Sequence, residues 1–418
     1  MRNVHSIYQV FVRNYSKEGT LYAVEKDLNR ICAMGFDYIY LLPIHPIGKE
    51  MRKGTYGSPY AVQDYMAIDK ELGTMSDFLH LIKAAHQKGL KVMMDIVIHH
   101  SAVDHAWVKQ RHSYYAFENA VLQWSDVKDF DFDNAQLQDA LLRMLIFWVK
   151  KGIDGIRCDV ASLIPVSFWE KARSMCQRIN PAFLMLAESV DIECILQQRS
   201  KGHIAMGDGE LSRVFDDLYP YSIRREFEAA VQKKELLPYE RAVNHLVAML
   251  PEGTNEVWYL ENHDCPRIYK QLRENRRRTL NWLAYSFLMP GAAFVYNGQE
   301  TWAVHLPQLF EKDPIDWTKA DADYMHLIAQ YNALRRTYMP LVQGYELIEN
   351  ERCLEVRAYE KGGKIYAGGF NVNGHQGEIE VHLADGSYQN CLRQEEIKIA
   401  KGKVSSCSFP YWLECSSL

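Results

Sequence analysis

Along roughly its first two-thirds, the chain alternates short apolar runs with longer segments whose apolar residues recur at helical spacing. Short apolar runs are typical of buried strands, and the longer segments are typical of amphipathic helices. The pattern predicts strands at residues 6–12, 36–42, 90–98, 153–158, 183–187, 213–215, 256–260 and 292–296. Strands that alternate with helices pair in parallel, and eight such units close a (β/α)8 barrel, also called a TIM barrel.

Two predicted helices begin at recognisable capping residues. Thr74 and Asp77 match a capping box, and apolar side chains then recur at helical spacing up to Gly89. Asn134 precedes a strongly apolar helix. Another helix opens on the basic run at residues 276–278, whose arginines we expect on a solvated face.

The pattern changes near residue 340. Beyond that point helical spacing disappears, and alternating strands such as residues 353–358 and 364–368 are separated by glycine-containing turns. Such spacing is typical of an antiparallel β-sandwich. We therefore predict a barrel at residues 1–340, with a short excursion after the third strand at residues 99–133, and a C-terminal β-sandwich domain at residues 341–418.

The composition argues against several classes of partner. The 418 residues are 48% hydrophobic and 24% charged, and the net charge of −5 gives no reason to expect a nucleic acid or an anionic membrane as partner. No apolar stretch approaches the ~20 residues of a membrane span, and the N-terminus lacks the apolar region of a signal peptide. None of the nine cysteines form a Cys-x-x-Cys pair, so we expect free thiols and a cytoplasmic protein.

Four of the predicted strands end in acidic side chains, at residues 95–100, 155–159, 187–188 and 261–264. In a (β/α)8 barrel the carboxyl ends of the strands meet at one mouth, where active sites lie. A single acid at a strand end is more often a cap or an ion-pair partner than a catalyst, but four in barrel order are much harder to explain that way. Carboxylates gathered in one site suit glycoside hydrolysis, in which one attacks the anomeric carbon and another protonates the leaving oxygen.

The residues beside two of these acids predict opposite ionisation states. Arg157 and Asp159 point to the same face of their strand, because strand side chains alternate with a period of two. We expect the guanidinium to orient Asp159 and to keep it ionised, as a nucleophile requires. Glu188 follows the apolar run at residues 183–187, where partial burial raises the pKa of a carboxyl group, as a general acid requires.

In order and spacing, these four segments resemble the signature regions of the α-amylase family, the retaining glycoside hydrolases of family 13. The resemblance extends from Ile7 through the β-rich tail and includes segments at residues 57–65, 67–74 and 295–300. Each segment alone is a weak signal, whereas their combination is specific.

The resemblance implies a role for each acid. Asp159 would be the nucleophile, Glu188 the general acid/base, and Asp264 the third acid, which binds the distorted sugar. Arg157 would position Asp159. Asp95 would be a structural acid without a catalytic step.

Three further residues are implied to bind the sugar ring in subsite −1, the ring whose bond is cut. His100 and His263 would form hydrogen bonds to this sugar, and Tyr60 would stack beneath it. Without the surrounding motifs, Tyr60 would be taken as a packing residue and His100 as a core histidine.

Departures from the family pattern bear on metal binding. His99 stands where many relatives have an asparagine that binds calcium, and the excursion at residues 99–133 is short. Calcium prefers oxygen ligands, so we expect no metal ion at the usual site. A different oxygen site stays open where aspartates cluster at positions 126, 129, 131 and 133. The spacing of the histidines at positions 99, 100, 105 and 112 does not support zinc.

The sequence thus predicts a retaining hydrolase that acts on α-1,4-linked maltooligosaccharides or related α-glucans without an organic cofactor. A 4-α-glucanotransferase with the same catalytic residues is the alternative. A non-catalytic carbohydrate-binding homologue is disfavoured, because all three acids are present. Ser162 and Leu163 replace the Lys-His pair that contacts the leaving half of the glucan in many relatives, which leaves the product pattern open. Chain length, endo or exo action and oligomeric state also stay open.

Overall fold

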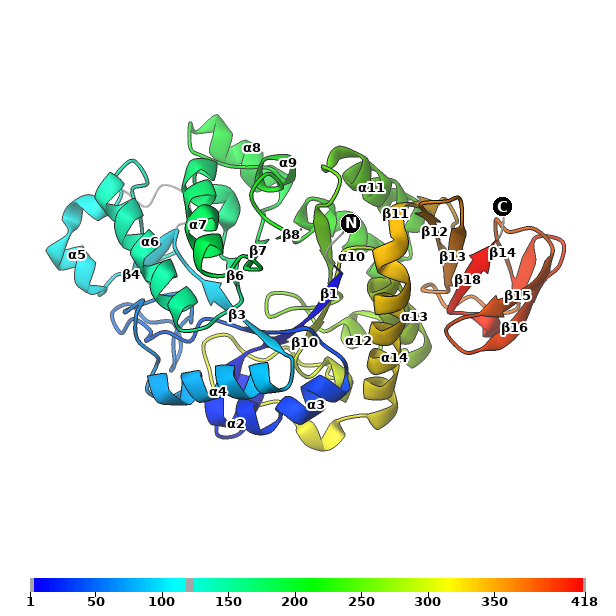
Figure 1. The fold of residues 1–418 in the computed structure, drawn as a ribbon, viewed down its shortest axis with the longest axis horizontal. Coiled ribbons are helices and arrows are strands. Elements are labelled where there is room, and N and C mark those ends of the chain that lie inside the picture. The colour runs from blue at the N-terminus through cyan, green and yellow to red at the C-terminus, as the bar shows by residue number, and fades with distance from the viewer. Residues whose placement is uncertain (1–3, 118–123, 416–418) are drawn as a thin grey trace.

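The computed structural model describes residues 4–117 and 124–415 of the chain (Figure 1). Eight parallel strands form a closed barrel in the order β1-β10-β9-β8-β7-β6-β3-β2, which confirms the predicted fold class. The strands are β1 (His5–Val10), β2 (Tyr38–Leu41), β3 (Lys91–Ile96), β6 (Gly155–Cys158), β7 (Leu184–Ala187), β8 (Asp217–Leu218), β9 (Asn255–Trp258) and β10 (Ala292–Tyr296).

Helices surround the barrel and connect its strands (Figure 1). Thr74 and Asp77 form the predicted capping box, and the Asn134 side chain accepts hydrogen bonds from two backbone amides. The helices are α1 (Val12–Tyr15), α2 (Leu21–Lys26), α3 (Leu28–Ala33), α4 (Met75–Gln87), α5 (Ala106–Gln110), α6 (Ala135–Lys150), α7 (Val166–Ile179), α8 (Ile192–Ser200), α9 (Asp208–Leu211), α10 (Arg224–Lys233), α11 (Leu236–Met249), α12 (Ile268–Gln271), α13 (Arg276–Leu288) and α14 (Ala322–Tyr338). No helix in the described ranges is long and apolar enough to cross a membrane.

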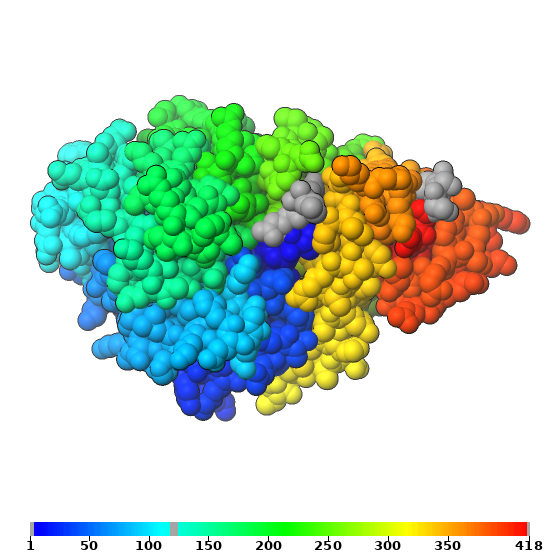
Figure 2. Space-filling model, viewed as in Figure 1, coloured from blue at the N-terminus to red at the C-terminus, as the bar shows by residue number. Residues whose placement is uncertain are grey.

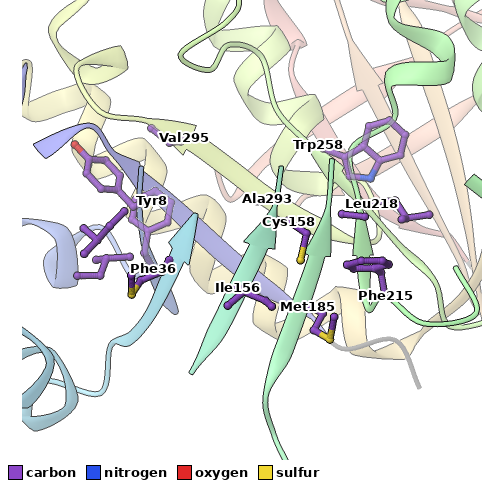
Figure 3. Packing of buried hydrophobic residues seen from close by; sticks show 14 of the residues in the cluster. Tyr8, Phe36, Ile156, Cys158, Met185, Phe215, Leu218, Trp258, Ala293 and Val295 are labelled. Carbon is purple, nitrogen blue, oxygen red and sulfur yellow. The ribbon is translucent and has the colours of Figure 1, made fainter. Parts of the chain in front are cut away.

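The barrel strands contribute alternate side chains to two separate apolar clusters. Ile7 and Tyr40 belong to the cluster inside the barrel. Tyr8, Ile156 and Met185 belong to the larger cluster between the strands and the helices, part of which Figure 3 shows. Because both faces of each strand are buried, the strands read as nearly continuous apolar runs in the sequence.

The strand predicted at residues 213–215 is wrong. These residues form a turn after α9, and β8 begins two residues later at Asp217. Phe215 is apolar because its ring lies edge-on against Trp169 of α7, with 5.2 Å between ring centroids. The segment is apolar because it packs against a helix, and its short apolar run therefore resembles that of a strand.

The C-terminal part is antiparallel and forms a lobe at one end of the molecule, orange to red in Figure 2. Its sheet has the order β11-β12-β13-β18-β15-β16, and a second sheet pairs β14 with β17. An excursion of the barrel carries one more short pair, β4 (His100–Ala102) with β5 (Val127–Asp129). The C-terminal strands are β11 (Val342–Ile348), β12 (Leu354–Glu360), β13 (Ile365–Phe370), β14 (Glu378–Glu380), β15 (Gly386–Asn390), β16 (Glu395–Ile399), β17 (Lys403–Ser405) and β18 (Tyr411–Cys415).

The basic run at residues 276–278 divides between two surroundings: the Arg276 side chain is 64% exposed, on a solvated face as predicted, whereas Arg277 and Arg278 join the barrel to this lobe. Arg278 is 7% exposed and donates to the carbonyl oxygens of Val372, at 2.8 Å, and Val231, at 3.0 Å. Arg277 donates to the carbonyl oxygen of Ser406. Charged donors of α13 thus reach backbone carbonyl groups of the lobe, at Val372 and Ser406, and of α10, at Val231.

A buried carboxyl group at the same junction makes stability depend on pH. Glu240 of α11 is fully buried and accepts a hydrogen bond of 3.1 Å from the backbone amide of Asn350. Burial raises the pKa of Glu240 from 4.5 to about 8. The folded state therefore holds a proton that the unfolded state releases, and this contribution to stability is lost as the pH rises from about 4.5 through about 8.

We expect Glu240→Gln, which cannot ionise, to melt higher than the wild-type protein at about pH 8, by roughly 3 °C or more, and to gain much less at about pH 5. Thermal melting followed by circular dichroism at both pH values measures the difference. The matched control is Glu349→Gln, an exposed neighbour that pairs with Arg241 across the surface. An equal effect of Glu240→Gln at the two pH values would contradict the assignment.

Candidate active site

Hydrogen bonds that continue beyond the strand ends hold two of the predicted acids in place. The backbone amide of Asp159 donates to Ile96 O at 3.0 Å, and that of Glu188 donates to Cys158 O at 3.0 Å. Asp95 and Arg157 are directly paired in the register of β3 and β6. Parallel pairing therefore brings the ends of β3, β6 and β7 together at the mouth of the barrel.

The guanidinium of Arg157 is shared by three carboxyl groups. Its Nη1 lies 2.8 Å from both Asp95 Oδ1 and Asp159 Oδ1, and Nη2 lies 2.5 Å from Glu188 Oε1. Arg157 is 1% exposed, so these charges interact with little solvent screening. One positive charge does not balance three negative ones, and burial disfavours the excess charge.

The ionisation of Asp159 therefore differs from the sequence-based expectation. Burial raises the pKa of Asp159 well above its ordinary value; Arg157 lowers it, while the neighbouring Glu188 and Asp95 raise it further. The guanidinium orients Asp159 as predicted, but it does not serve this carboxyl group alone.

Backbone strain between the two central acids positions Glu188. Val160 has a φ of 38°, in the left-handed region that a β-branched residue rarely adopts. In this conformation its amide donates to Glu188 Oε2 at 2.9 Å. Strain of this kind persists only where the surroundings impose it and is concentrated at functional sites.

A chain of hydrogen bonds fixes the aromatic floor. Tyr60 and His263 are stacked, with 5.5 Å between ring centroids and an interplanar angle of 15°. Tyr60 Oη lies 2.9 Å from Asp95 Oδ2 and 2.5 Å from His263 Nε2, and His263 Nδ1 lies 3.0 Å from Gln9 Nε2. If Gln9 donates to Nδ1, then Nε2 carries the proton of a neutral imidazole and Tyr60 donates to Asp95. Burial and then Arg157 lower the pKa of His263 to about 4, so the ring is neutral at pH 7.

The remaining predicted residues, Asp264 and His100, lie in the cavity above this floor. The Asp264 side chain is 42% exposed, and its carboxyl oxygen lies 3.1 Å from His263 Nε2. His100 is fully buried, and burial lowers its pKa to about 4. Its Nε2 has no hydrogen-bond partner among the described residues. A neutral imidazole with a spare nitrogen is suited to bind a hydroxyl group.

The cavity has a volume of about 410 Å3, and five of the predicted residues line it: Tyr60, His100, Asp159, Glu188 and Asp264. Arg157 and His263 lie beneath them. The cavity is also lined by Asp126, which the sequence indicated only as a possible metal ligand, and by residues that the sequence did not indicate: Lys53, Trp124, Tyr221, Arg224 and Phe310. They lie in loops, in the short 3-10 helix at Tyr221–Ile223 and at the start of α10, in segments without a recognised motif, so only the fold identifies their place in the site.

Ser162 and Leu163 do not face the cavity. Ser162 is fully buried, and its Oγ accepts a hydrogen bond of 3.1 Å from the amide of Val190. Leu163 is 4% exposed and packs in a small cluster with Ile195 and Ala205. These positions therefore support the loop that follows Glu188 and leave contact with a leaving group to other residues.

A cluster that the sequence did not indicate lies beside the site. His99, His100 and Asp129 each have a ligating atom within 4.8 Å of the other two. Two imidazoles and one carboxylate do not match the all-oxygen set that calcium prefers, although imidazole is a common ligand of transition metals. Burial lowers the pKa of His99 to about 3. The ring is therefore neutral at pH 7 and needs no negatively charged partner.

Comparisons with known proteins show similarity over most of the chain. Residues 9–125 and 113–338 match the model of an alpha amylase catalytic domain, and residues 350–413 match that of a bacterial alpha amylase C-terminal domain. The crystal structure of an alpha-amylase from Lactobacillus plantarum is 34% identical, with a TM-score of 0.92 over 98% of each chain.

Two curated relatives match over shorter shares of their length. An alpha-amylase from Haloarcula japonica is 25% identical over 82% of this chain, which spans 50% of that relative. An alpha-1,4-glucan:maltose-1-phosphate maltosyltransferase from Methylacidiphilum infernorum is 34% identical over 44% of this chain and 32% of its own length.

We expect calcium to stabilise the protein little, because His99 stands in place of the family's asparagine ligand and the excursion at residues 99–133 is short. A ligand stabilises by RT ln(1 + [L]/Kd), so without a tight site the melting temperature should change by less than about 1 °C between EDTA and ~1 mM calcium. Melting curves in the two buffers measure this. A calcium-dependent rise of about 5 °C or more that disappears in Asp131→Asn or Asp133→Asn would reveal a different oxygen site.

Proposed function

Because this chain belongs to the α-amylase family of glycoside hydrolases, we propose that it hydrolyses α-1,4-glucosidic bonds in maltooligosaccharides or related α-glucans with retention of configuration. The observation that supports retention is the sharing of one guanidinium by Asp159 and Glu188, at 2.8 and 2.5 Å. Retaining enzymes hold their two carboxyl groups ~5–5.5 Å apart, whereas inverting enzymes need ~6.5–9.5 Å to admit a water molecule. Because both carboxyl groups contact the same guanidinium, the shorter separation of the retaining enzymes is favoured.

In this mechanism Asp159 attacks the anomeric carbon while Glu188 gives its proton to the leaving oxygen. A covalent glycosyl–Asp159 intermediate forms, and Glu188 then removes a proton from the water molecule that attacks the same carbon. Asp264, His100 and His263 hold the sugar hydroxyl groups. Tyr60 supplies an aromatic face beneath the ring.

The two central acids differ in their hydrogen-bond partners. Both carboxyl oxygens of Glu188 accept hydrogen bonds, from Arg157 and from the amide of Val160. Asp159 Oδ2 has no hydrogen-bond partner among the described residues. The mechanism requires a protonated Glu188 and an ionised Asp159 at the moment of attack.

Transfer to a second sugar is the alternative outcome, because it uses the same covalent intermediate and the same residues. The similarity to a maltosyltransferase relative supports keeping it as an alternative. Product analysis on maltotriose to maltoheptaose distinguishes the two: shorter products alone indicate hydrolysis, and products longer than the substrate indicate transfer. We further propose a reducing compartment such as the cytoplasm, because all nine cysteines are free.

Asp159→Asn removes the nucleophile with almost no change in volume, so we expect kcat to fall by roughly 10⁴-fold or more while the fold is kept. Product release from maltoheptaose, together with circular dichroism, measures both effects. The matched control is Asp323→Asn, an exposed aspartate in the first turn of α14, which should leave kcat unchanged. A variant that keeps a tenth of wild-type activity would show that Asp159 is not the nucleophile.

Glu188→Gln should slow natural oligosaccharides far more than aryl glycosides with good leaving groups, because a basic leaving oxygen needs a proton most. Azide should restore turnover of the aryl glycoside by trapping the glycosyl-enzyme as a glycosyl azide of retained configuration. Kinetics with both substrates, with and without azide, provide the measurement. Equal losses on both substrates and no azide product would remove Glu188 from this role.

A further inference from the structure

Two loops face Glu188 from the opposite side of the barrel mouth. Glu188 directly follows β7, and in the closed barrel β1 lies four places from β7 in either direction. The strands that flank β1 are β2 and β10, and the loops that follow them contain residues 52–58 and 305–313. Ser58, Leu309 and Phe310 of these loops line the same cavity as Asp159 and Glu188.

Backbone contacts join the two loops directly. The amide of Tyr56 donates to Phe310 O at 3.0 Å, and the amide of Thr55 donates to Glu311 Oε1 at 2.9 Å. Gly54 lies so close to the second loop that an added Cβ would be 2.9 Å from Phe310 O and 2.7 Å from Glu311 Oε1. Its φ of 63° also favours glycine. The loops thus approach each other at a point that admits no side chain.

A buried arginine fixes both loops to the barrel. Arg13, in the segment after β1, is 7% exposed, and its Nη1 donates to Gly57 O and to Leu309 O, each at 3.1 Å. The guanidinium also lies over the Tyr56 ring, 5.5 Å from its centroid. Charge-assisted hydrogen bonds to both loops make this junction part of the folded framework instead of a movable flap.

A third loop closes the remaining side. Lys53 Nζ lies 2.7 Å from Asp126 Oδ1, in the excursion after β3, and 6.0 Å from the centroid of the Phe310 ring. Asp126 is 3% exposed, whereas the Lys53 side chain is 35% exposed. Trp124 of the same excursion lies edge-on to His100, with 5.4 Å between ring centroids. We call the wall formed by residues 53–58, 309–311 and 124–126 the distal wall.

The chemistry of the substrate sets which end of a glucan meets this wall. Glu188 protonates the oxygen at C1 of the sugar in subsite −1, so the leaving half of the glucan lies on the Glu188 side. In an α-1,4-glucan the preceding sugar is attached at C4, at the opposite end of the ring from C1. The non-reducing end of the substrate therefore extends from subsite −1 toward the distal wall.

We propose that the distal wall makes this enzyme exo-acting, so that it removes one short unit of fixed length from the non-reducing end. This inference rests on the proposed glycosidase function. The cavity that holds Asp159 and Glu188 is lined by Lys53, Trp124 and Phe310 of the wall, so the non-reducing end of a bound glucan meets these side chains. Lys53 Nζ has three N–H donors and uses one in its ion pair with Asp126. The other donors can bind hydroxyl groups of the non-reducing terminal sugar.

The test uses p-nitrophenyl maltoheptaoside, either free at its non-reducing end or blocked there by a 4,6-O-ethylidene group. Chromatography follows the first products of each. The wild-type enzyme should release a single short oligosaccharide from the free substrate and cleave the blocked one at least about 100-fold more slowly, the scale on which a shaped site rejects a misfit group. Comparable cleavage of both substrates would overturn the inference and leave the glycosidase function intact. Failure on both would overturn the proposed function itself.

Variants of the distal wall test whether it causes the selectivity. Lys53→Ala and, separately, Phe310→Ala should each reduce the ratio of free to blocked cleavage by about 10-fold, because each removes a group that closes the wall. Lys88→Ala, an exposed lysine at the end of α4, is the matched control and should keep the wild-type ratio. If both wall variants fold, shown by circular dichroism, and keep the wild-type ratio, then the wall does not set the selectivity.

Discussion

The site depends on one constraint, the burial of a single guanidinium among three carboxyl groups. Arg157 binds Asp95, Asp159 and Glu188 at distances of 2.5 to 2.8 Å. Removing one partner from such a buried group leaves a charge without compensation, which costs several kcal/mol. The three acids therefore keep fixed positions around the guanidinium.

The barrel supplies the rigidity that this arrangement needs. Parallel pairing of β3, β6 and β7 sets the relative heights of the acids, and the left-handed backbone of Val160 aims an amide at Glu188. The aromatic floor then extends the network through Tyr60 and His263 to Gln9 of β1. The reacting groups are thus attached to several strands at once, which favours a preorganised site.

Much of this arrangement follows from local sequence patterns, and the rest does not. The strand ends that carry Asp159, Glu188 and Asp264 are found from apolar runs followed by acids, because parallel strands place their carboxyl ends together. The prediction of a strand at residues 213–215 is wrong, because packing of Phe215 against Trp169 gives the segment the same apolar pattern as a buried strand. The pairing of Lys53 with Asp126 and the meeting of Asp129 with His99 join segments distant in sequence, so no spacing rule indicates them. The partners of Arg278 are likewise set by tertiary packing alone.

The junction between α13 and β13 has a consequence for how the chain is divided. Arg278 reaches Val372 O, the Asn281 side chain accepts the amide of Asn371 at 2.8 Å, and the rings of Tyr285 and Phe370 meet at 5.6 Å. Cutting the chain near residue 340 would remove one acceptor of the Arg278 guanidinium, the backbone donor to Asn281 Oδ1 and one ring contact of Tyr285. The change of pattern near residue 340 therefore marks a change of architecture and not a boundary between two independently folding domains. The two parts should therefore melt in a single cooperative transition. A barrel expressed alone would expose the polar groups that the lobe covers.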